Sequence, residues 1–454
     1  MNRLCKYALL LLLASARLTG LAQSSPEEKL SMTMYAIGHM YVDSVDMSAL
    51  VEQQIKELVQ RLDPHSEYLP PAVAKANEQV LTGNNTQEPN QQAAVAQEGK
   101  APTGIAAAYL VKPGIGYIMV NMFTETTAAE FRERLQALQQ QGMKHLILNL
   151  QKNGGGFFET ALELADEFLH KGEELVMTEG AHSNRQVVKG QKEGAFEKGR
   201  LAVLISEQTM SAAEIFAGAI QDWDRGILVG RRTFGKGLIQ ETLPFSDGSA
   251  LRLTVAKYYT PCGRSIQKPY QGLSREEYAQ EAVSRAQGDD NVAEKGNPYH
   301  SLRTGRTLYG GGGISPDVTV AADTIPSSDW YALLTYAGVQ KQTAREYVSS
   351  HRQELEKAYS DMKKFKNRFS GDELLPAACT MAEERAGIPF DKEAFEQSKA
   401  FVALQLKALV ARELFGKDDC YYEIMGERNM ALQQAIAILT DSNRYNKLLN
   451  DTKR

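Results

Sequence analysis

The chain has 454 residues, of which 43% are hydrophobic and 24% charged, close to the averages of globular proteins. Its length is about three times that of a typical domain of roughly 150 residues, so we expect two or three domains, and the composition excludes a wholly disordered, collagenous or polytopic membrane protein. With 51 Lys and Arg against 56 Asp and Glu, a net charge of -5 and no long basic run, the chain is a poor candidate for binding nucleic acid.

The first 22 residues have the three parts of a secretory signal peptide. Arg3 and Lys6 give a positive start, the run from Tyr7 to Ala16 is apolar, and Gly20-Leu21-Ala22 places small residues before a cleavage point. The apolar run is well short of the roughly 20 residues that span a bilayer. We therefore predict cleavage after Ala22, no membrane span in the mature chain, and an exported protein that is periplasmic if the host has an outer membrane.

The cysteines are few and scattered along the chain. Four of them, Cys5, Cys262, Cys379 and Cys420, provide neither a disulfide framework nor the short ligand spacing of a zinc site. We predict no metal and no cofactor. Loss of Cys5 with the signal peptide would leave an odd number, so at least one thiol would be free or bonded to another molecule.

Residues 23–69 are predicted to form a helical segment, and residues 70–113 a linker. The first stretch has apolar residues at helical spacing in two groups, which the motif Asp63-Pro64-His65-Ser66 ends. The second is dominated by Gln, Asn, Ala and Glu between Ala74 and Gly99 and has no aromatic residue there.

Residues 114–320 are predicted to form an α/β core, because short apolar strands alternate with helical patterns. The expected strands are 115–120, 145–150, 201–205, 227–229, 238–243 and 250–259, and the expected helices are 128–138, 160–169 and 211–220. Beyond Pro316 the pattern is almost wholly helical, so residues 321–454 are predicted to form a separate helical domain.

Ser211 is the first candidate for chemistry. It follows the buried strand 201–205 and stands where a helix begins, so unpaired N–H groups and the positive end of the helix dipole lie beside it. The N–H of Ala212 is placed to meet an oxyanion formed there. Ser211 and Glu214 also match a capping box, in which the hydroxyl serves only to cap the helix. From this segment alone both interpretations stay open.

Lys236 is the second candidate. It lies between Gly235 and Gly237, with Phe234 before them and an apolar pair after them, so its ammonium can be desolvated. Burial lowers the pKa of a lysine, which suits it to act as general base to a serine. The alternative is an ordinary surface lysine in a turn. A phosphate-binding loop is not supported, because residues typical of a strand follow Lys236 where such a loop needs a helix.

A glycine-rich turn is the third candidate. Gly154, Gly155 and Gly156 follow the buried strand 145–150, where a tight turn can point N–H groups at a carbonyl oxygen. The alternative is a plain turn between a strand and a helix.

Taken together in order, these motifs closely resemble the carboxyl-terminal processing (tail-specific) proteases, a family of exported serine peptidases. The resemblance covers most of the mature chain, including a helical C-terminal extension like that of Bacteroidetes members. It rests on Asp63-Pro64-His65-Ser66, Asn153-Gly154-Gly155-Gly156, Ser211-Ala212-x-Glu214, Thr233-Phe234-Gly235-Lys236 with Gln240, Asp247-Gly248-Ser249, Tyr258-Tyr259-Thr260-Pro261 and Tyr309-Gly310 to Asp317.

The resemblance implies a ClpP/crotonase-like protease core and a specific set of site residues. Ser211 would be the nucleophile, Lys236 the general base and Gln240 the residue that orients the lysine, with the N–H groups of Gly155 and Ala212 as oxyanion donors. It also implies a serine endopeptidase that cleaves unfolded or C-terminal segments of exported polypeptides.

The sequence departs from the family pattern in two places that matter for function. Members usually carry a PDZ domain of about 80 to 100 residues that binds substrate C-termini, whereas only the 44 residues 70–113 occupy that place here. Asn149 and Gln151 stand where the family commonly has Asp and Arg. These departures motivate a second hypothesis, a catalytically inactive homologue that acts as a binding scaffold or adaptor. An adaptor protein as partner and a homodimer through the C-terminal helices are compatible with either hypothesis.

Overall fold

The computed structural model describes residues 24–82, 103–286, 298–323, 326 and 328–451. The chain divides into two units, Met1–Leu62 and Asp63–Arg454, which are described separately. The predicted signal peptide, residues 1–22, lies outside the described residues. No helix in the described ranges is long and apolar enough to cross a bilayer.

The described part of the first unit consists of two helices, α2 (Pro26–Met40) and α3 (Met47–Gln60), where the sequence predicts two short helices. Ser25 caps α2 in a capping box with Glu28, and the Asp46 side chain accepts from the Ala49 N–H at the start of α3.

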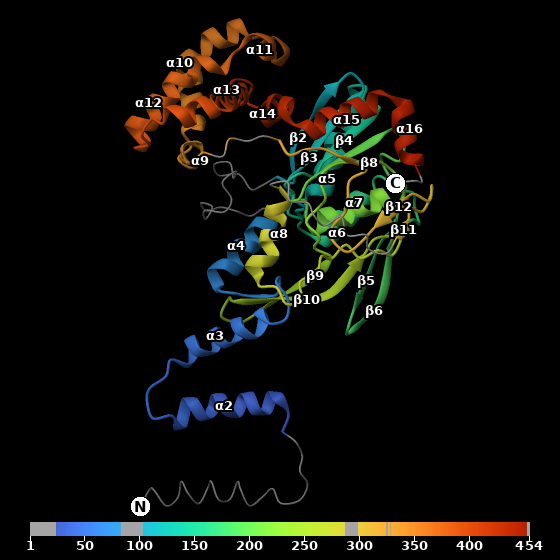
Figure 1. The fold of residues 1–454 in the computed structure, drawn as a ribbon, viewed down its shortest axis with the longest axis vertical. Coiled ribbons are helices and arrows are strands. Elements are labelled where there is room, and N and C mark those ends of the chain that lie inside the picture. The colour runs from blue at the N-terminus through green and yellow to red at the C-terminus, as the bar shows by residue number, and fades with distance from the viewer. Residues whose placement is uncertain (1–23, 83–102, 287–297, 324–325, 327, 452–454) are drawn as a thin grey trace, which may run out of the picture. The chain divides into compact units, whose positions relative to one another are not determined.

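A six-stranded sheet forms the centre of the second unit (Figure 1). Its strands run in the order β13-β8-β7-β4-β3-β2, and all neighbours are parallel except the antiparallel pair β2 and β3. The strands are β2 (Ile105–Lys112), β3 (Ile115–Val120), β4 (His145–Asn149), β7 (Leu201–Ile205), β8 (Ile227–Gly230) and β13 (Val318–Thr319). Parallel strands are buried on both faces, which explains why β4, β7 and β8 read as continuous apolar runs.

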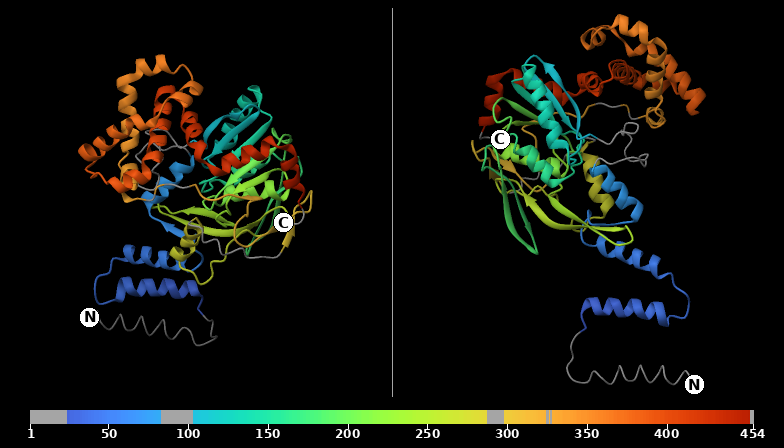
Figure 2. Two further views of the ribbon diagram at one scale, coloured as in Figure 1. Left: turned by 45° about the horizontal axis from the view of Figure 1, so that its top comes forward. Right: turned by 180° about the vertical axis from the view of Figure 1, so that it is seen from behind.

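Helices cover both faces of this sheet (Figures 1 and 2). Because side chains alternate along a strand, Leu146 and Leu148 of β4 lie in one hydrophobic cluster and Ile147 in another. The first cluster includes buried residues of α5 (Thr127–Gln140), α6 (Phe158–Ala165) and α7 (Ala212–Asp222), and the second those of α15 (Met430–Thr440) and α16 (Ser442–Asn450). The core is thus a three-layer α/β/α sandwich.

A second, antiparallel sheet lies beside the sandwich in the same unit. Its order is β1-β10-β5-β6, and β9 pairs with the other edge of β10. The strands are β1 (Glu67–Leu69), β5 (Glu174–Gly180), β6 (Ser183–Lys189), β9 (Leu238–Pro244) and β10 (Ala250–Tyr259). The remaining elements of this region are α8 (Arg275–Ala286) and the hairpin of β11 (Pro298–His300) and β12 (Thr307–Tyr309).

The helices after residue 328 have a hydrophobic core of their own, centred on α10 and α13. They are α9 (Asp329–Tyr336), α10 (Val339–Ala358), α11 (Met362–Arg368), α12 (Leu375–Ala386), α13 (Lys392–Phe415) and α14 (Asp418–Met425), with short 3-10 turns at Gly371–Leu374 and Gly426–Arg428.

The structure corrects two of the predicted boundaries. The predicted linker, residues 70–113, contains the helix α4 (Pro71–Thr82) and the strand β2, so the sheet begins before residue 114; residues 83–102 lie outside the described ranges. The predicted helical domain, 321–454, includes α15 and α16, which belong to the sandwich instead. In both cases the element, β2 or the pair α15 and α16, belongs to the sandwich because it packs against strands that lie outside its own predicted segment. Local composition does not reveal such contacts.

Candidate active site

The turns that follow β4 and β7 meet at one edge of the central sheet. These two strands are parallel neighbours, so their carboxyl ends lie side by side. The Met210 N–H donates to the Asn153 carbonyl oxygen at 2.9 Å, which joins the two turns directly. The glycine-rich turn and Ser211, 55 or more residues apart in the sequence, are therefore in contact.

Ser211 has a backbone conformation that side chains rarely adopt. Its φ is 57° and its ψ is -120°, at the sharp turn between the segment after β7 and the first residue of α7. Such a conformation costs on the order of 1–3 kcal/mol, and it persists where the surroundings impose it, often at functional sites. The side chain is only partly buried, so a substrate can reach it.

The capping interpretation of Ser211 is half fulfilled. Glu214 Oε2 accepts from the Ser211 N–H at 2.9 Å, as in a capping box. The Glu214 N–H donates to the Ser211 carbonyl oxygen at 2.8 Å, and none of the hydrogen bonds found among the described residues involves the Ser211 hydroxyl. The hydroxyl is therefore not committed to the cap by a hydrogen bond.

The two predicted oxyanion donors lie beside Ser211 but differ in their hydrogen bonds. Ala212 is the first residue of α7, so its N–H has no partner within the helix. Gly155 has φ 101°, and a Cβ built on it would come within 2.9 Å of the Ser211 Cβ. The Gly155 N–H donates to Asn153 Oδ1 at 2.8 Å. In this conformation that N–H is already engaged, which differs from the role predicted for it.

Lys236 lies just before β9 with its amine drawn into the protein. Burial, reinforced by the Arg252 guanidinium, lowers the pKa of Lys236 to about 8, although Glu67, Asp63 and Glu214 act in the opposite direction. Its Nζ donates to Gln240 Oε1 at 2.7 Å. The predicted pair of lysine and glutamine is thus in contact, although only Gln240 lies in the strand and Lys236 precedes it.

Glu214 and Tyr258 hold the serine and lysine segments together. The buried Glu214 carboxylate accepts from the Ser211, Gly235 and Lys236 N–H groups at 2.7–2.9 Å and from the Thr233 hydroxyl at 2.5 Å. Burial raises the pKa of Glu214, and these hydrogen bonds oppose the rise. Tyr258 Oη contacts the carbonyl oxygens of Ser211 (3.1 Å) and Lys236 (2.7 Å).

Sequence reasoning assigned Glu214 only to a cap and gave Tyr258 no role. Both belong to motifs quoted for the resemblance, and their position there is the signal that points to them. Among the hydrogen bonds of the described residues, none joins Lys236 Nζ to the Ser211 hydroxyl. The two segments are joined instead by the Glu214 carboxylate and the Tyr258 hydroxyl, which contact backbone groups of both.

The two departures from the family pattern have defined contacts. Asn149 Nδ2 donates to the Tyr117 hydroxyl at 2.8 Å, and Asn149 Oδ1 accepts from the Gln151 N–H at 2.7 Å. Gln151 Oε1 accepts from Asn429 Nδ2 at 2.6 Å, which connects the turn to the residue that caps α15. Neutral side chains therefore support this turn without an ion pair.

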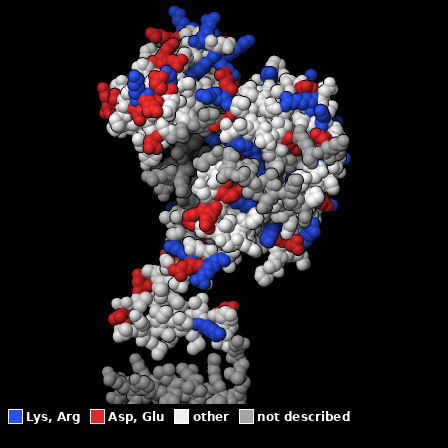
Figure 3. All heavy atoms as spheres, in the orientation of Figure 1, with Lys and Arg blue, Asp and Glu red and all other residues white. Residues whose placement is uncertain are grey.

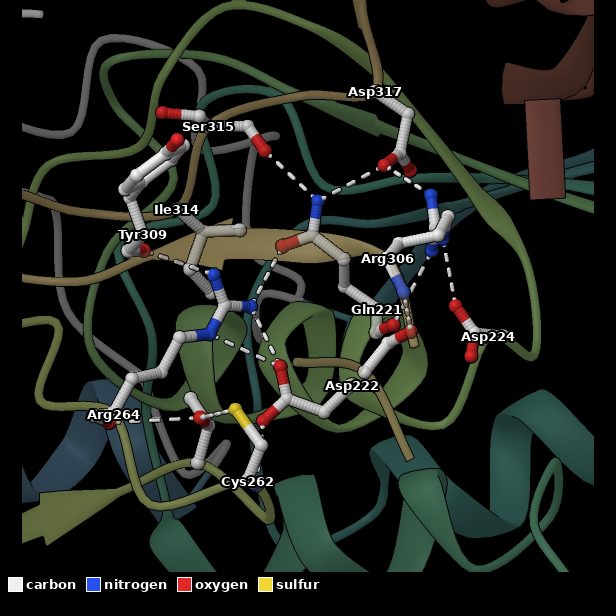
Figure 4. Close-up of polar contacts among 12 residues, drawn as sticks. Gln221, Asp222, Asp224, Cys262, Arg264, Arg306, Tyr309, Ile314, Ser315 and Asp317 are labelled. Atoms are coloured by element: carbon white, nitrogen blue, oxygen red, sulfur yellow. Dashed lines mark hydrogen bonds and ion pairs between the residues drawn. The ribbon is translucent and has the colours of Figure 1, made fainter. Parts of the chain in front are cut away.

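The far end of α7 is fixed by buried ion pairs (Figure 4). Arg264 pairs with Asp222 at 2.7 Å, with both side chains at most 1% exposed. Arg306 pairs with Asp224 at 2.7 Å and with Asp317 at 2.6 Å. These ion pairs thus hold the end of the helix that begins directly after Ser211.

One cluster of potential metal ligands lies away from Ser211 and Lys236. His170, Glu193 and Glu197 place one ligand atom each within 4.8 Å of one another, on loops that carry none of the candidate catalytic residues. His170 Nδ1 lies 2.7 Å from Glu197 Oε2, and a hydrogen bond with Glu197 raises the pKa of Glu193. These three side chains therefore interact with one another. The cysteines of the described residues, Cys262, Cys379 and Cys420, are free thiols.

Comparison with known proteins identifies two regions of the chain. Residues 114–274 match the family described as Peptidase family S41, and residues 330–416 match a family of unknown function, DUF8443. The chain is 38% identical over 154 residues to the carboxy-terminal processing protease CtpA of Bacillus subtilis, covering 34% of this chain and 33% of that protein. It is 36% identical over 170 residues to the chloroplastic C-terminal processing peptidase of Tetradesmus obliquus, covering 37% and 36%.

The chain spans about a third of the length of these curated relatives. Among solved structures, the photosystem II D1 C-terminal processing protease aligns with 67% of this chain and 96% of its own, at 21% identity and a TM-score of 0.40. The region that holds the strained serine and the buried lysine, residues 114–274, is thus the part of this chain that is similar to peptidase family S41, in agreement with the resemblance found in the sequence.

Proposed function

We propose that this protein is a serine endopeptidase in which Ser211 is the nucleophile, Lys236 the general base and Gln240 the residue that orients the lysine. The observation that carries the proposal is the strained backbone of Ser211 at the start of α7, clamped to a lysine segment whose amine has a pKa of about 8. The family match and the relatives named as processing proteases support it.

The reaction would proceed through an acyl-enzyme. Neutral Lys236 Nζ accepts the hydroxyl proton as Ser211 Oγ attacks the carbonyl carbon of the scissile peptide bond. The lysine then gives this proton to the nitrogen of the leaving amine, and water repeats the steps to release the acyl group. The Ala212 N–H, at the positive end of α7, is placed to stabilise the oxyanion.

Lys236 works as a base only in its neutral form. Its pKa of about 8 means that the neutral fraction increases as the pH rises through that value. Activity is therefore expected to increase from neutral pH to mildly alkaline pH, where an unperturbed lysine would still be almost wholly protonated.

Digestion of a flexible protein such as casein tests the proposal. The wild-type protein should cleave it, and Ser211→Ala and Lys236→Ala should each reduce the rate by a factor on the order of 10³ or more. Lys399→Ala, which changes an exposed lysine of α13, is the matched control and should cleave normally. Equal cleavage by all four proteins would contradict the assignment.

We further propose that the substrates are unfolded or C-terminal segments of exported polypeptides, and that the enzyme itself is exported. The motivation is the signal-peptide pattern of residues 1–22 together with the relatives' names. Sequencing the N-terminus of the protein recovered from the cell envelope should give Gln23 as the first residue. Recovery of the uncleaved chain from the cytoplasm would contradict export.

A scaffold without catalysis is the alternative, and two contacts favour it. The Gly155 N–H donates to Asn153, and Lys236 Nζ contacts Gln240 rather than the serine. A serine-reactive fluorophosphonate distinguishes the two functions. A scaffold would show no adduct on Ser211, while the protease would be labelled there. Light scattering after size exclusion would test the proposed homodimer, since a monomer at working concentration excludes it.

A further inference from the structure

The polarity of the Gln240 amide decides whether it can support Lys236. An amide has a donor end and an acceptor end, and only its oxygen can accept from the lysine amine. Gln240 presents Oε1 to Lys236 Nζ at 2.7 Å, and its Nε2 donates to the His65 carbonyl oxygen at 2.8 Å. A carbonyl oxygen can only accept, so it holds the amide in the useful orientation.

The His65 carbonyl is itself fixed by a compact turn. Asp63 Oδ1 accepts from the His65 and Ser66 N–H groups, both at 2.8 Å, and Asp63 Oδ2 accepts from Ser66 Oγ at 2.6 Å. The wholly buried Ser66 Oγ then accepts from the Thr254 N–H of β10 at 3.0 Å. Thr254 is the residue paired with Gln240 in the β9–β10 register.

Helix α8 supports the same turn from its other side. Arg275 Nη2 donates to the Ser66 carbonyl oxygen at 2.8 Å, and the Tyr278 hydroxyl lies 3.1 Å from His65 Nε2. The His65 ring also packs edge-on against Phe234, which precedes the lysine segment. The turn is thus held by β10 and α8, and its hydrogen bond to β9, among those of the described residues, is made by the His65 carbonyl oxygen.

We propose that the Asp63–Ser66 turn is a positioning element for the general base, acting on Lys236 through the amide of Gln240. This inference rests on the proposed function and adds a part to it. By fixing Oε1 as the acceptor of one amine hydrogen, the turn leaves the lone pair of neutral Lys236 directed away from Gln240, where it can receive the serine proton. Asp63, His65 and Ser66 are positioning residues, since none is in contact with Ser211 in the hydrogen bonds described.

The charged groups around Lys236 come from several elements. Asp63 and Glu67 of the N-terminal side and Glu214 of α7 favour its protonated form, and Arg252 of β10 disfavours it. Burial and the nearby lysine lower the pKa of His65 to about 3. His65 is therefore neutral near pH 8. A change in the reactivity of Ser211 with a midpoint near pH 8 would thus report the deprotonation of Lys236, not of His65.

A double-mutant cycle of Ser66→Ala and Gln240→Ala tests the proposal without changing any charge. The first measurement is the rate of fluorophosphonate labelling of Ser211 as a function of pH. The second is the pKa of Lys236 from competitive acetylation with acetic anhydride, read by mass spectrometry, which needs no turnover. Circular dichroism establishes that each variant is folded at the temperature used.

Ser66→Ala is expected to slow labelling about tenfold, because the amide and hence the amine lose their fixed orientation. It should also lower the midpoint of the labelling rate against pH by about half a pH unit. The reason is that the Lys236 ammonium loses Gln240 Oε1 as a permanently oriented hydrogen-bond acceptor. In the Gln240→Ala background the same change should alter neither quantity. Ser249→Ala, in the similar Asp247–Ser249 turn between β9 and β10, is the matched control and should behave as wild type.

The proposal would be overturned if Ser66→Ala had equal effects in the wild-type and Gln240→Ala backgrounds. It would also be overturned if Ser66→Ala had the labelling rate and the pH midpoint of the wild type. If Ser66→Ala fails to fold, Tyr278→Phe replaces it in the cycle, because it removes the hydroxyl that contacts His65 of the same turn without changing a charge. Absence of labelling in the wild type would contradict the proposed function, while the pKa measurement would still decide whether the turn acts on Lys236.

Discussion

Ser211 is kept in its strained conformation by hydrogen bonds on both sides of it. Its N–H donates to Glu214, and its carbonyl oxygen accepts from the Glu214 N–H and contacts the Tyr258 hydroxyl. These bonds can offset a cost on the order of 1–3 kcal/mol. Because Glu214 and Tyr258 make equivalent contacts to the lysine segment, the same groups set the position of both candidate catalytic residues.

Tyr258→Phe should therefore impair the site more than it impairs folding. The change leaves the ring in place and removes the hydroxyl that bridges the Ser211 and Lys236 carbonyls, so we expect a loss of about 1–2 kcal/mol in the free energy of unfolding. Labelling of Ser211 by a fluorophosphonate should slow about tenfold.

Tyr445→Phe is the matched control for this variant. Tyr445 is also buried, at 4% exposed against 1% for Tyr258, and its hydroxyl contacts both the N–H and the carbonyl oxygen of Leu201. It should cost a similar amount of stability and leave labelling unchanged. Equal labelling rates in the two variants would refute a role for Tyr258 at the site.

Gly155→Ala tests how closely the glycine-rich turn packs against the nucleophile. The new methyl would come within 2.9 Å of the Ser211 Cβ and 3.0 Å of the Met210 carbonyl oxygen. We expect kcat/KM for casein to fall about 100-fold. Gly142→Ala has a comparable φ of 90° with no atom within 4 Å of the added methyl, so it should lose stability but keep activity. A Gly155→Ala enzyme of normal activity would contradict this packing.

The family resemblance implies Ser211, Lys236 and Gln240 as a group; the structure brings Lys236 and Gln240 into contact, and the catalytic roles of the three stay a prediction. The sequence could not show that Asn153 takes the Gly155 N–H, since this depends on the rotamer of a buried side chain. Nor could it show that Asp63 and Ser66 act near Lys236, because the contact requires β1, β10 and β9 to be neighbours.

At the scale of elements, α7 is fixed at both ends. Its first turn carries the Glu214 contacts, and its last residue, Asp222, pairs with Arg264. Asp224, two residues beyond the helix, pairs with Arg306. These ion pairs join segments more than 40 residues apart, so no local pattern predicts them.

The predicted strands and helices of the core lie close to their observed ranges. The reason is that β4, β7 and β8 are continuous apolar runs and that α5 and α7 show helical spacing.

Arg264→Ala should destabilise the protein strongly. It leaves the inaccessible Asp222 carboxylate without its partner, which costs about 3–5 kcal/mol in the free energy of unfolding. Lys399→Ala removes an exposed ion pair with Glu396 on α13. It should change the free energy of unfolding by less than about 1 kcal/mol. Urea unfolding measures both. Similar losses in the two variants would show that the buried pair is not important for holding α7.

At the scale of the whole molecule, the sandwich is completed by the last helices of the chain. Ala431, Leu432, Ala435 and Ile438 of α15 cover the face of the sheet that α5, α6 and α7 leave open. The sequence placed these residues in a separate helical domain, because helical periodicity does not say which surface the apolar face meets.

Ile438→Asp should therefore disrupt the α/β/α sandwich from a position far along the chain. Ile438 is fully buried against the sheet, and a carboxylate there is expected to cost about 3 kcal/mol or more. Met430→Asp changes a residue of the same helix that is 54% exposed and should be tolerated. Hydrogen exchange in β4 and β7 is the measurement. Unchanged protection of these strands in Ile438→Asp would contradict the packing of α15 on the sheet.

The surface carries both signs of charge. On the face drawn in Figure 3, Lys and Arg are interspersed with Asp and Glu, and neither sign forms a continuous surface there. This distribution accords with a net charge of -5 spread over 454 residues.

The pH dependence of Ser211 labelling tests the central claim most directly. Fluorophosphonate is reacted with the wild type and Lys236→Ala from about pH 6 to about pH 10, and peptide mass spectrometry locates the adduct. We predict an adduct on Ser211 whose rate of formation rises with a midpoint at about pH 8 and is lost in Lys236→Ala. A rate independent of pH, an adduct on another residue, or equal labelling of Lys236→Ala would contradict a serine nucleophile served by a lysine base.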